Sequence, residues 1–220
     1  MRRKNKLVIQ SVNLINTKQL TSTALNANME LLQLQNMRHH YSRVRMRFLS
    51  IGAKETSINF DNVFTGALPD LVIVGLMSEA DLASGYQRNA FNFQNFGVNR
   101  IELKRNNTSV PRGGYTPNFA NGQYLKAYMT LLQELECDTG DKSVSITPFE
   151  WANEYTLYAF KNTDGLIGPG TYGPRSKSAT GSARLEISFA AAVNENIKVI
   201  IYYQMLGRIE FDKFHAVIVL

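Results

Sequence analysis

The chain has 220 residues, of which 44% are hydrophobic and 19% charged, and its formal net charge is +6. A hydrophobic share of this size is enough for one well-formed core and excludes a disordered chain. Cys137 is the single cysteine, so an internal disulfide is excluded. The apolar residues 7–9 after the basic start are too few for a signal peptide, and no apolar run is long enough for a membrane span, so we expect neither secretion nor membrane insertion.

The first 40 residues differ in character from the rest. Residues 1–20 form a basic lead-in followed by a predicted strand, and Leu25, Met29 and Leu32 are spaced as one stripe of a short helix. We therefore divide the chain into residues 1–40, with this lead-in, strand and linking helix, and residues 41–220, the main domain.

The segment 43–48 alternates strictly between basic and apolar residues, which is typical of a strand with two unlike faces. Arg38 lies shortly before it. Val44, Met46 and Phe48 share one face, and Arg43, Arg45 and Arg47 share the other.

About eight strands are predicted between residues 43 and 220. The segments after the first are 57–60, 71–77, 101–104, 155–160, 183–189, 198–203 and the β-prone end of the chain. Residues 105–122 and 161–182 are interpreted as loops because they are rich in Asn, Gly, Pro or Ser. A helix is predicted on an apolar stripe formed by Leu125, Tyr128, Met129, Leu132 and Leu135.

This pattern predicts a mainly β fold, an eight-stranded jelly-roll sandwich with one or two inserted helices. Another Greek-key sandwich satisfies the same periodicity, so the pattern alone leaves both open.

Catalytic chemistry has no candidate residues in the sequence. The glycine-rich segment 165–170 lacks the Gly-Lys-Ser/Thr ending of a phosphate-binding loop, and His39 and His40 are adjacent, so on an extended segment they point to opposite sides. No nucleophile, base and orienting residue assemble by spacing. We expect no enzyme activity, no catalytic residue, no metal site and no cofactor.

Seven residues are candidates for contact with partners. The four arginines of residues 38–47 allow three interpretations: binding of phosphate, ion pairs with an adjacent subunit, and a solvated face that discourages edge pairing. The net charge allows weak attraction to nucleic acid. Three aromatic residues are candidates for a protein interface or for glycan stacking. The candidates are Arg38, Arg43, Arg45, Arg47, Tyr115, Trp151 and Tyr172.

Five blocks of the sequence, in this order and spacing, resemble the double-jelly-roll major capsid proteins of Polinton/Maverick elements and adintoviruses. The resemblance runs from about Val12 to Asp212. The blocks are Ile58–Gly75, Asn89–Phe96, Tyr155–Phe160, Gly181–Phe189 and Ile209–Asp212.

The resemblance implies a function. Subunits of that family carry two stacked jelly rolls, and three subunits form a pseudo-hexagonal, hexon-like capsomer. The chain is similar to the second jelly roll, with residues 7–20 similar to the last strand of the first and residues 21–36 to the linking helix. We therefore expect a structural capsid protein that self-associates as a homotrimer and with other capsid proteins, in a virion assembled in the host nucleus or cytoplasm. Without the first jelly roll, the chain is expected to be a fragment or a domesticated copy. The alternative is a jelly-roll module that binds carbohydrate or protein.

Overall fold

The computed structural model describes residues 36–82, 88–89, 91–138, 144–161, 180–212, 214 and 216–219, together with six helical residues between 23 and 33. Tyr172, the glycine-rich segment 165–170 and the predicted strand in residues 1–20 lie outside the described residues. By its internal contacts the chain divides into two units. One comprises Met1–His39 with Arg208–Leu220, and the other comprises His40–Gly207.

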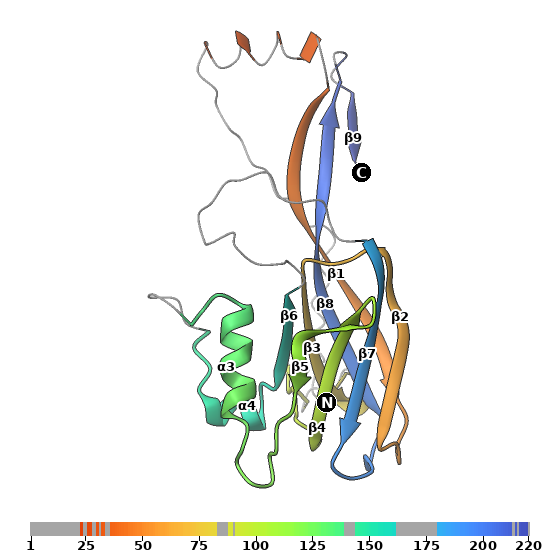
Figure 1. The fold of residues 1–220 in the computed structure, drawn as a ribbon, viewed down its shortest axis with the longest axis vertical. Coiled ribbons are helices and arrows are strands. Elements are labelled where there is room, and N and C mark those ends of the chain that lie inside the picture. Colours follow the sequence, from red (N-terminus) through yellow and green to blue (C-terminus); the bar gives the residue numbers. More distant parts are fainter. Residues whose placement is uncertain are drawn as a thin grey trace, which may run out of the picture. The chain divides into compact units, whose positions relative to one another are not determined.

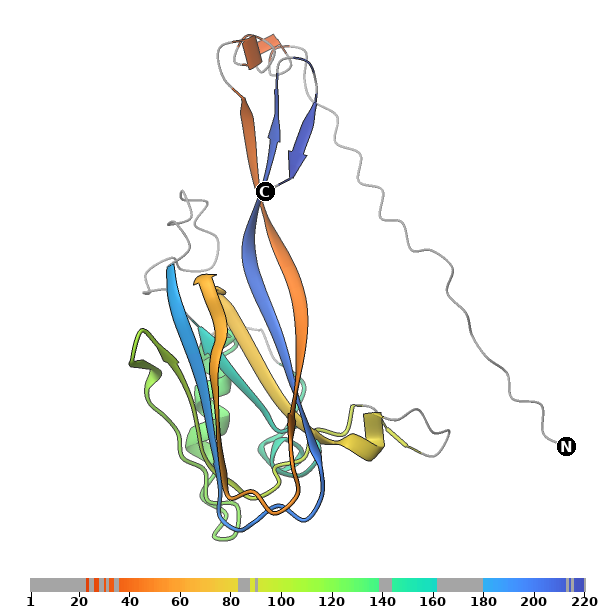
Figure 2. The same cartoon turned by 90° about the vertical axis from the view of Figure 1, so that its right-hand side faces the viewer.

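Nine strands and three short helices are described. Two antiparallel sheets hold the strands as layers of a sandwich (Figures 1 and 2). The strands are β1 (Met37–Ile51), β2 (Ser57–Ala67), β3 (Leu71–Ser78), β4 (Val98–Arg105), β5 (Thr108–Tyr115), β6 (Leu157–Lys161), β7 (Thr180–Phe189), β8 (Ile197–Phe211) and β9 (Val217–Val219). The helices are α2 (Glu79–Leu82), α3 (Leu125–Glu134) and α4 (Pro148–Asn153).

The strand order is that of a jelly roll. One sheet has the order β1-β8-β3-β6, with β9 paired to the end of β8, and the other has the order β2-β7-β4-β5. The first strand pairs with the eighth, the second with the seventh, the third with the sixth and the fourth with the fifth. This nesting is one long antiparallel hairpin rolled into two four-stranded sheets, which distinguishes a jelly roll from other Greek-key sandwiches. The predicted fold class is confirmed, and β9 is a short addition to it.

The core lies between the two sheets and follows the alternation of their strands. In β7 the residues Ala183, Leu185, Ile187 and Phe189 are buried while those between them are only partly covered. In β3 the apolar run is buried on both faces at its end, as expected for a central strand.

Strand β5 occupies part of the segment that the sequence analysis assigned to a loop. It contains Pro111, Gly113 and Gly114, which are uncommon in strands. β5 is the edge strand of its sheet, where a residue without an N–H can be accommodated. Its pairing with β4 also shifts register between Ile101 and Leu103. The Pro and Gly content of this segment is typical of a loop, and for that reason the sequence did not predict the strand.

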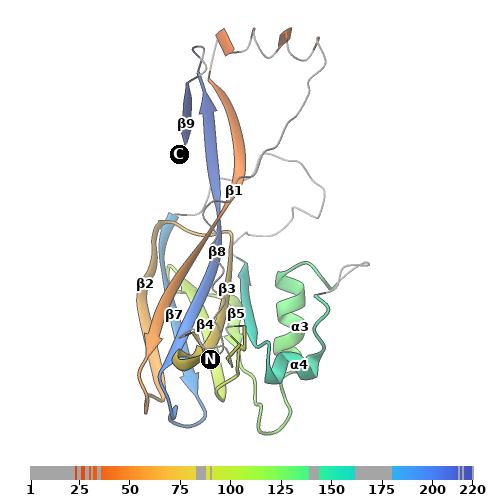
Figure 3. The same ribbon diagram turned by 180° about the vertical axis from the view of Figure 1, so that it is seen from behind.

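Helices α3 and α4 lie in the connection between β5 and β6, and Figures 1 and 3 show both beside β6. α4 begins at a capping box, in which the Thr147 hydroxyl accepts from the Glu150 N–H and the Glu150 carboxylate accepts from the Thr147 N–H. The buried face of α3 consists of Ala127, Tyr128 and Leu131. Leu125 and Met129, which the sequence analysis placed on the apolar stripe, are exposed.

Gly75 in β3 is a site where a side chain does not fit. A Cβ atom there would lie 2.6 Å from Cδ1 of Phe93 and 2.9 Å from Cδ2 of Leu157. Phe93 is held in place by two backbone hydrogen bonds, because its N–H donates to Glu154 and its carbonyl accepts from Thr156. We expect Gly75→Ala to cost about 1–3 kcal/mol of unfolding free energy through overpacking. Urea unfolding measures this, and Gly52→Ala, where nothing lies within 4 Å of the added Cβ, is the matched control.

Candidate assembly surfaces

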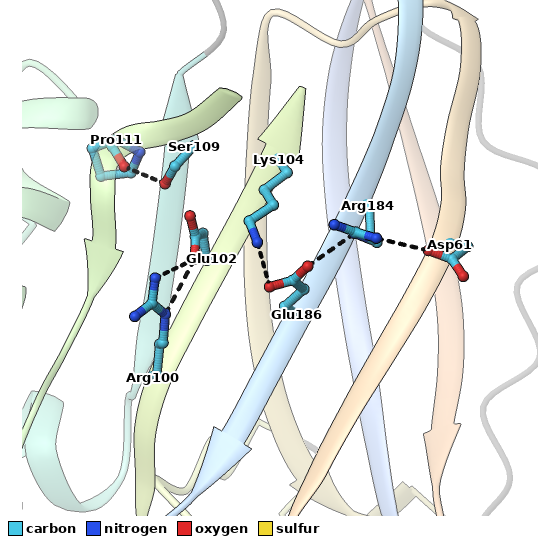
Figure 4. Close-up of polar contacts among 8 residues, drawn as sticks. All are labelled: Asp61, Arg100, Glu102, Lys104, Ser109, Pro111, Arg184 and Glu186. Carbon is cyan, nitrogen blue, oxygen red and sulfur yellow. Dashed lines mark hydrogen bonds and ion pairs between the residues drawn. The ribbon is translucent and has the colours of Figure 1, made fainter. Parts of the chain in front are cut away.

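The outer face of the β2-β7-β4-β5 sheet carries acidic and basic side chains that form ion pairs with one another (Figure 4). Glu102 on β4 and Glu186 on β7 are directly opposite each other, which by itself is repulsive. Each carboxylate has cations beside it. Arg100 binds Glu102 through Nη2 at 2.7 Å, and Glu186 binds Lys104 at 2.7 Å and Arg184 at 2.9 Å. The acidic and basic side chains of this network pair with one another, so they present little unpaired charge to a partner.

Glu102 is the most buried charged residue of this network, at 3% exposure. Burial alone would raise the pKa of Glu102, but hydrogen bonds from Ser109 and Arg100 and the positive charges of Arg100 and Lys104 outweigh it and hold the pKa below its ordinary value. The hydroxyl of Ser109 also lies 2.9 Å from the carbonyl oxygen of Pro111. Glu102 is therefore ionised at neutral pH, and its lowered pKa depends on Ser109, Arg100 and Lys104.

A shallow hollow of about 130 Å³ lies beside this network. It is smaller than the roughly 300 Å³ at which small-molecule pockets begin. Its lining is polar and carries no aromatic ring for stacking on a sugar. The hollow does not favour the carbohydrate-binding alternative. The lining residues are Asp61, Asn62, Lys104, Asn107, Ser182, Ala183 and Arg184.

The outer face of β1 is apolar and uncovered. Val44, Met46 and Phe48 are 48%, 55% and 51% exposed, although strict alternation would normally direct such a row inward. A side-chain hydrogen bond lies at each end of the row: Ser42 accepts from the Gln204 side chain, and Ser50 accepts from Lys198 Nζ at 2.7 Å. These two serines share the face of the apolar row, so the row is bounded at both ends by polar pairs.

Arg43, Arg45 and Arg47 lie on the opposite side of β1, the side on which Ile51 enters the core. Arg47 donates to the carbonyl of Val63 and lies 5.9 Å from the centre of the Phe64 ring. Arg43 lies over the ring of Tyr41 at the same distance, and Arg45 is exposed. The alternation of residues 43–48 therefore predicted two unlike faces correctly, and the structure shows that the apolar face is the outer one.

Arg38 belongs to the other unit. Its Nε lies 3.1 Å from Oε1 of Glu210, a distance that Arg208 Nε also has to the same oxygen. Arg38 is therefore part of a local ion cluster with Arg208 and Glu210.

Two of the three aromatic candidates are core residues. Trp151 is 0% exposed and its Nε1 donates to the Leu157 carbonyl at 2.9 Å, while Tyr115 is buried and donates to the Ala159 carbonyl. Burial raises the pKa of Tyr115 above its usual range. Their placement within the core leaves neither ring available on the surface. A sequence signal for α4 exists, because Thr147 and Glu150 have the spacing of a capping box and Pro148 follows the cap.

The described residues contain no group of three or more His, Cys, Asp or Glu side chains placed to hold a metal ion. Among the same residues no helix has the length and hydropathy to cross a membrane.

Comparison with known proteins gives similarity at the level of solved structures. No family model matches the chain, and no curated protein matches it. A chain of the cryo-EM structure of the Sputnik virophage is similar with a TM-score of 0.42 and 12% identity, over 83% of this chain and 39% of that one. The crystal structure of VP54 of PBCV-1, fitted into a reconstruction of Sputnik, is similar with a TM-score of 0.40 and 12% identity, over 79% of this chain and 49% of that one. The quasi-atomic model of the PBCV-1 virus capsid is similar with a TM-score of 0.42 and 11% identity, over 87% of this chain and 54% of that one.

The chain therefore spans 39% to 54% of the length of these three chains. At 11–12% identity and TM-scores of 0.40–0.42, these similarities carry no argument about function.

Proposed function

We propose that this protein is a structural protein of the capsid type, a jelly-roll tile that acts by associating with its own copies. The observation that carries the proposal is the contrast between the outer faces of the sandwich. The outer face of the β2-β7-β4-β5 sheet is charged and internally paired, as expected for contact with solvent. The outer face of β1 leaves an apolar row exposed, which is typical of an interaction surface.

The family resemblance supports the same function. The block Ile58–Gly75 covers most of β2 and more than half of β3, Gly181–Phe189 is nearly all of β7, and Ile209–Asp212 ends β8. Four of the five resembling blocks therefore coincide largely with strands of the two sheets, whereas the described residues of Asn89–Phe96 belong to no strand. We propose from this resemblance that the chain corresponds to a second jelly roll of the Polinton and adintovirus type, that it assembles into trimers within a virion capsid, and that it is not an enzyme.

Contact with a packaged genome is a lesser part of the proposal. Arg45 and Arg47 on β1 are both exposed, and the Arg47 guanidinium donates to the carbonyl of Val63. One or two free guanidinium groups give weak, salt-dependent attraction to phosphate and no sequence preference.

Sedimentation velocity of the purified chain tests the proposed function. Between about 1 µM and about 1 mM, the range of weak association, we expect species larger than the 24.8 kDa monomer, with the trimer as the first prominent one. A chain that stays monomeric over this whole range would contradict the proposal.

A further inference from the structure

Apart from the row on β1 and from Leu82 and Phe91, the exposed large apolar side chains in the described part of residues 40–207 lie on α3 and α4. Leu125 and Met129, one turn apart on α3, are 57% and 42% exposed, and Phe149 on the neighbouring α4 is 71% exposed. We name these three residues the helix patch. Val44, Met46 and Phe48 are named the strand patch. Each consists of three large apolar side chains that are about half exposed or more.

The two patches lie at opposite ends of one layer. The strand order β1-β8-β3-β6 places β1 at one edge of its sheet and β6 at the other, and α3 packs against β6. Figure 3 shows α3 and the lower part of β1 on opposite sides. A single copy can therefore use both patches at the same time, without competition between them.

Both patches are chemically suited to an apolar partner. The strand patch is flanked by hydroxyl and amide groups, and Lys198 at its end is paired with Glu79 at 2.8 Å. Each patch exposes roughly 300 Å² of apolar surface, the lower bound for the largest patch on a typical monomer. A standard interface buries about 800 Å² per partner, so each patch suffices as the apolar centre of one contact but needs a polar rim around it.

Pairing of β1 edge to edge is a poor alternative. An antiparallel pairing of two copies centred on Met46 would place Arg45 opposite Arg47 of the second copy. Like charges directly opposite on neighbouring strands are destabilising, and charged residues on an edge strand prevent such pairing. Association is therefore expected through the faces and not through extension of the sheet.

We infer that the helix patch of one copy docks on the strand patch of the next copy, in a head-to-tail contact. This inference rests on the proposed function and names the surfaces that it uses. Contacts between two different patches on identical chains are heterologous, and they close into a ring when the rotation per copy allows it. A ring of three copies buries all six patches and agrees with the trimer proposed above.

Two variants separate this arrangement from symmetric ones. Met46→Glu with Phe48→Glu disables the strand patch, and Leu125→Glu with Met129→Glu disables the helix patch. Each pair changes the formal net charge from +6 to +4 (6 − 2 = 4), so weaker association cannot result from greater repulsion between copies. Ala191→Glu with Ala192→Glu, in the exposed turn before β8, makes the same charge change away from both patches.

We expect each patch variant alone to sediment as a monomer, with self-association weakened at least tenfold, while the turn variant assembles like the unmodified chain. A mixture of the two patch variants in equal amounts is expected to form a 1:1 dimer and nothing larger, because one intact helix patch meets one intact strand patch. Circular dichroism and thermal melting are expected to match the unmodified chain, since all four positions are exposed.

Other outcomes are equally informative. If either patch variant alone assembles like the unmodified chain, or if the mixture forms no dimer, the head-to-tail contact is wrong while self-association stands. If the unmodified chain is monomeric throughout, the proposed function fails and this inference fails with it.

Discussion

Replacing Trp151 by alanine is expected to destabilise the fold by about 3–5 kcal/mol, the cost of removing a large buried aromatic side chain. The indole is fully buried at the junction of α3, α4 and β6. It lies edge-on to Tyr158, with ring centres 5.8 Å apart, and edge-on to Tyr128 at 6.2 Å. The hydrogen bond from Nε1 to the Leu157 carbonyl is also lost.

Urea unfolding followed by circular dichroism measures this change, because the variant lacks the only tryptophan and has no indole fluorescence. Phe149→Ala, on the same helix and 71% exposed, is the matched control and is expected to change the unfolding free energy by less than about 0.5 kcal/mol. Equal effects at the two positions would show that α4 does not close the core.

Arg100→Met is expected to cost about 2 kcal/mol at neutral pH, less than the 3–5 kcal/mol of a fully buried pair because the Arg100 side chain is half exposed. The substitution leaves the Glu102 carboxylate buried without its principal cation. Because burial alone raises the pKa of Glu102, loss of Arg100 moves that pKa upward from its lowered value.

The contribution of Glu102 to the unfolding free energy decreases as the pH falls. In the unmodified chain the lowered pKa of Glu102 contributes stability above its ordinary value of 4.5, and this contribution is lost as the pH falls through the lowered pKa of the folded state. At about pH 3 both proteins carry more protonated Glu102, so the difference between them is expected to narrow. Denaturant titrations at the two pH values measure it, and Glu102→Gln, which removes the buried charge, is the control. A difference that is constant with pH would mean that Arg100 acts by packing alone.

The sequence predicted most of the sheet framework, because the strands around residues 43–48, 71–77, 183–189 and 198–203 show regular alternation or continuous apolar runs. It did not separate a jelly roll from another Greek key. That distinction is which strand pairs with which, and pairing between residues more than a hundred positions apart leaves no local signature.

The candidate surfaces were harder to predict than the strands. Alternation assigns Met46 and Arg47 to opposite faces, but it does not say which face is outside. The inference that apolar residues turn inward fails at β1, because Ile51 fixes the phase of the strand and places the apolar row on the outer side. Likewise Leu125 and Met129 fit a helical stripe, but the contact with β6 is made by the neighbouring face of α3.

The nested pairing of strands also sets the order of events during synthesis. The β4–β5 hairpin closes locally, whereas β1 ends at Ile51 and its partner β8 begins only at Ile197. At typical translation speeds these 146 residues (197 − 51) take roughly 7–30 seconds to emerge, and during that time β1 has no neighbour in its sheet. Arg43, Arg45 and Arg47, which alternate with its apolar residues, then act as gatekeepers that keep a nascent β-prone segment from aggregating on the ribosome.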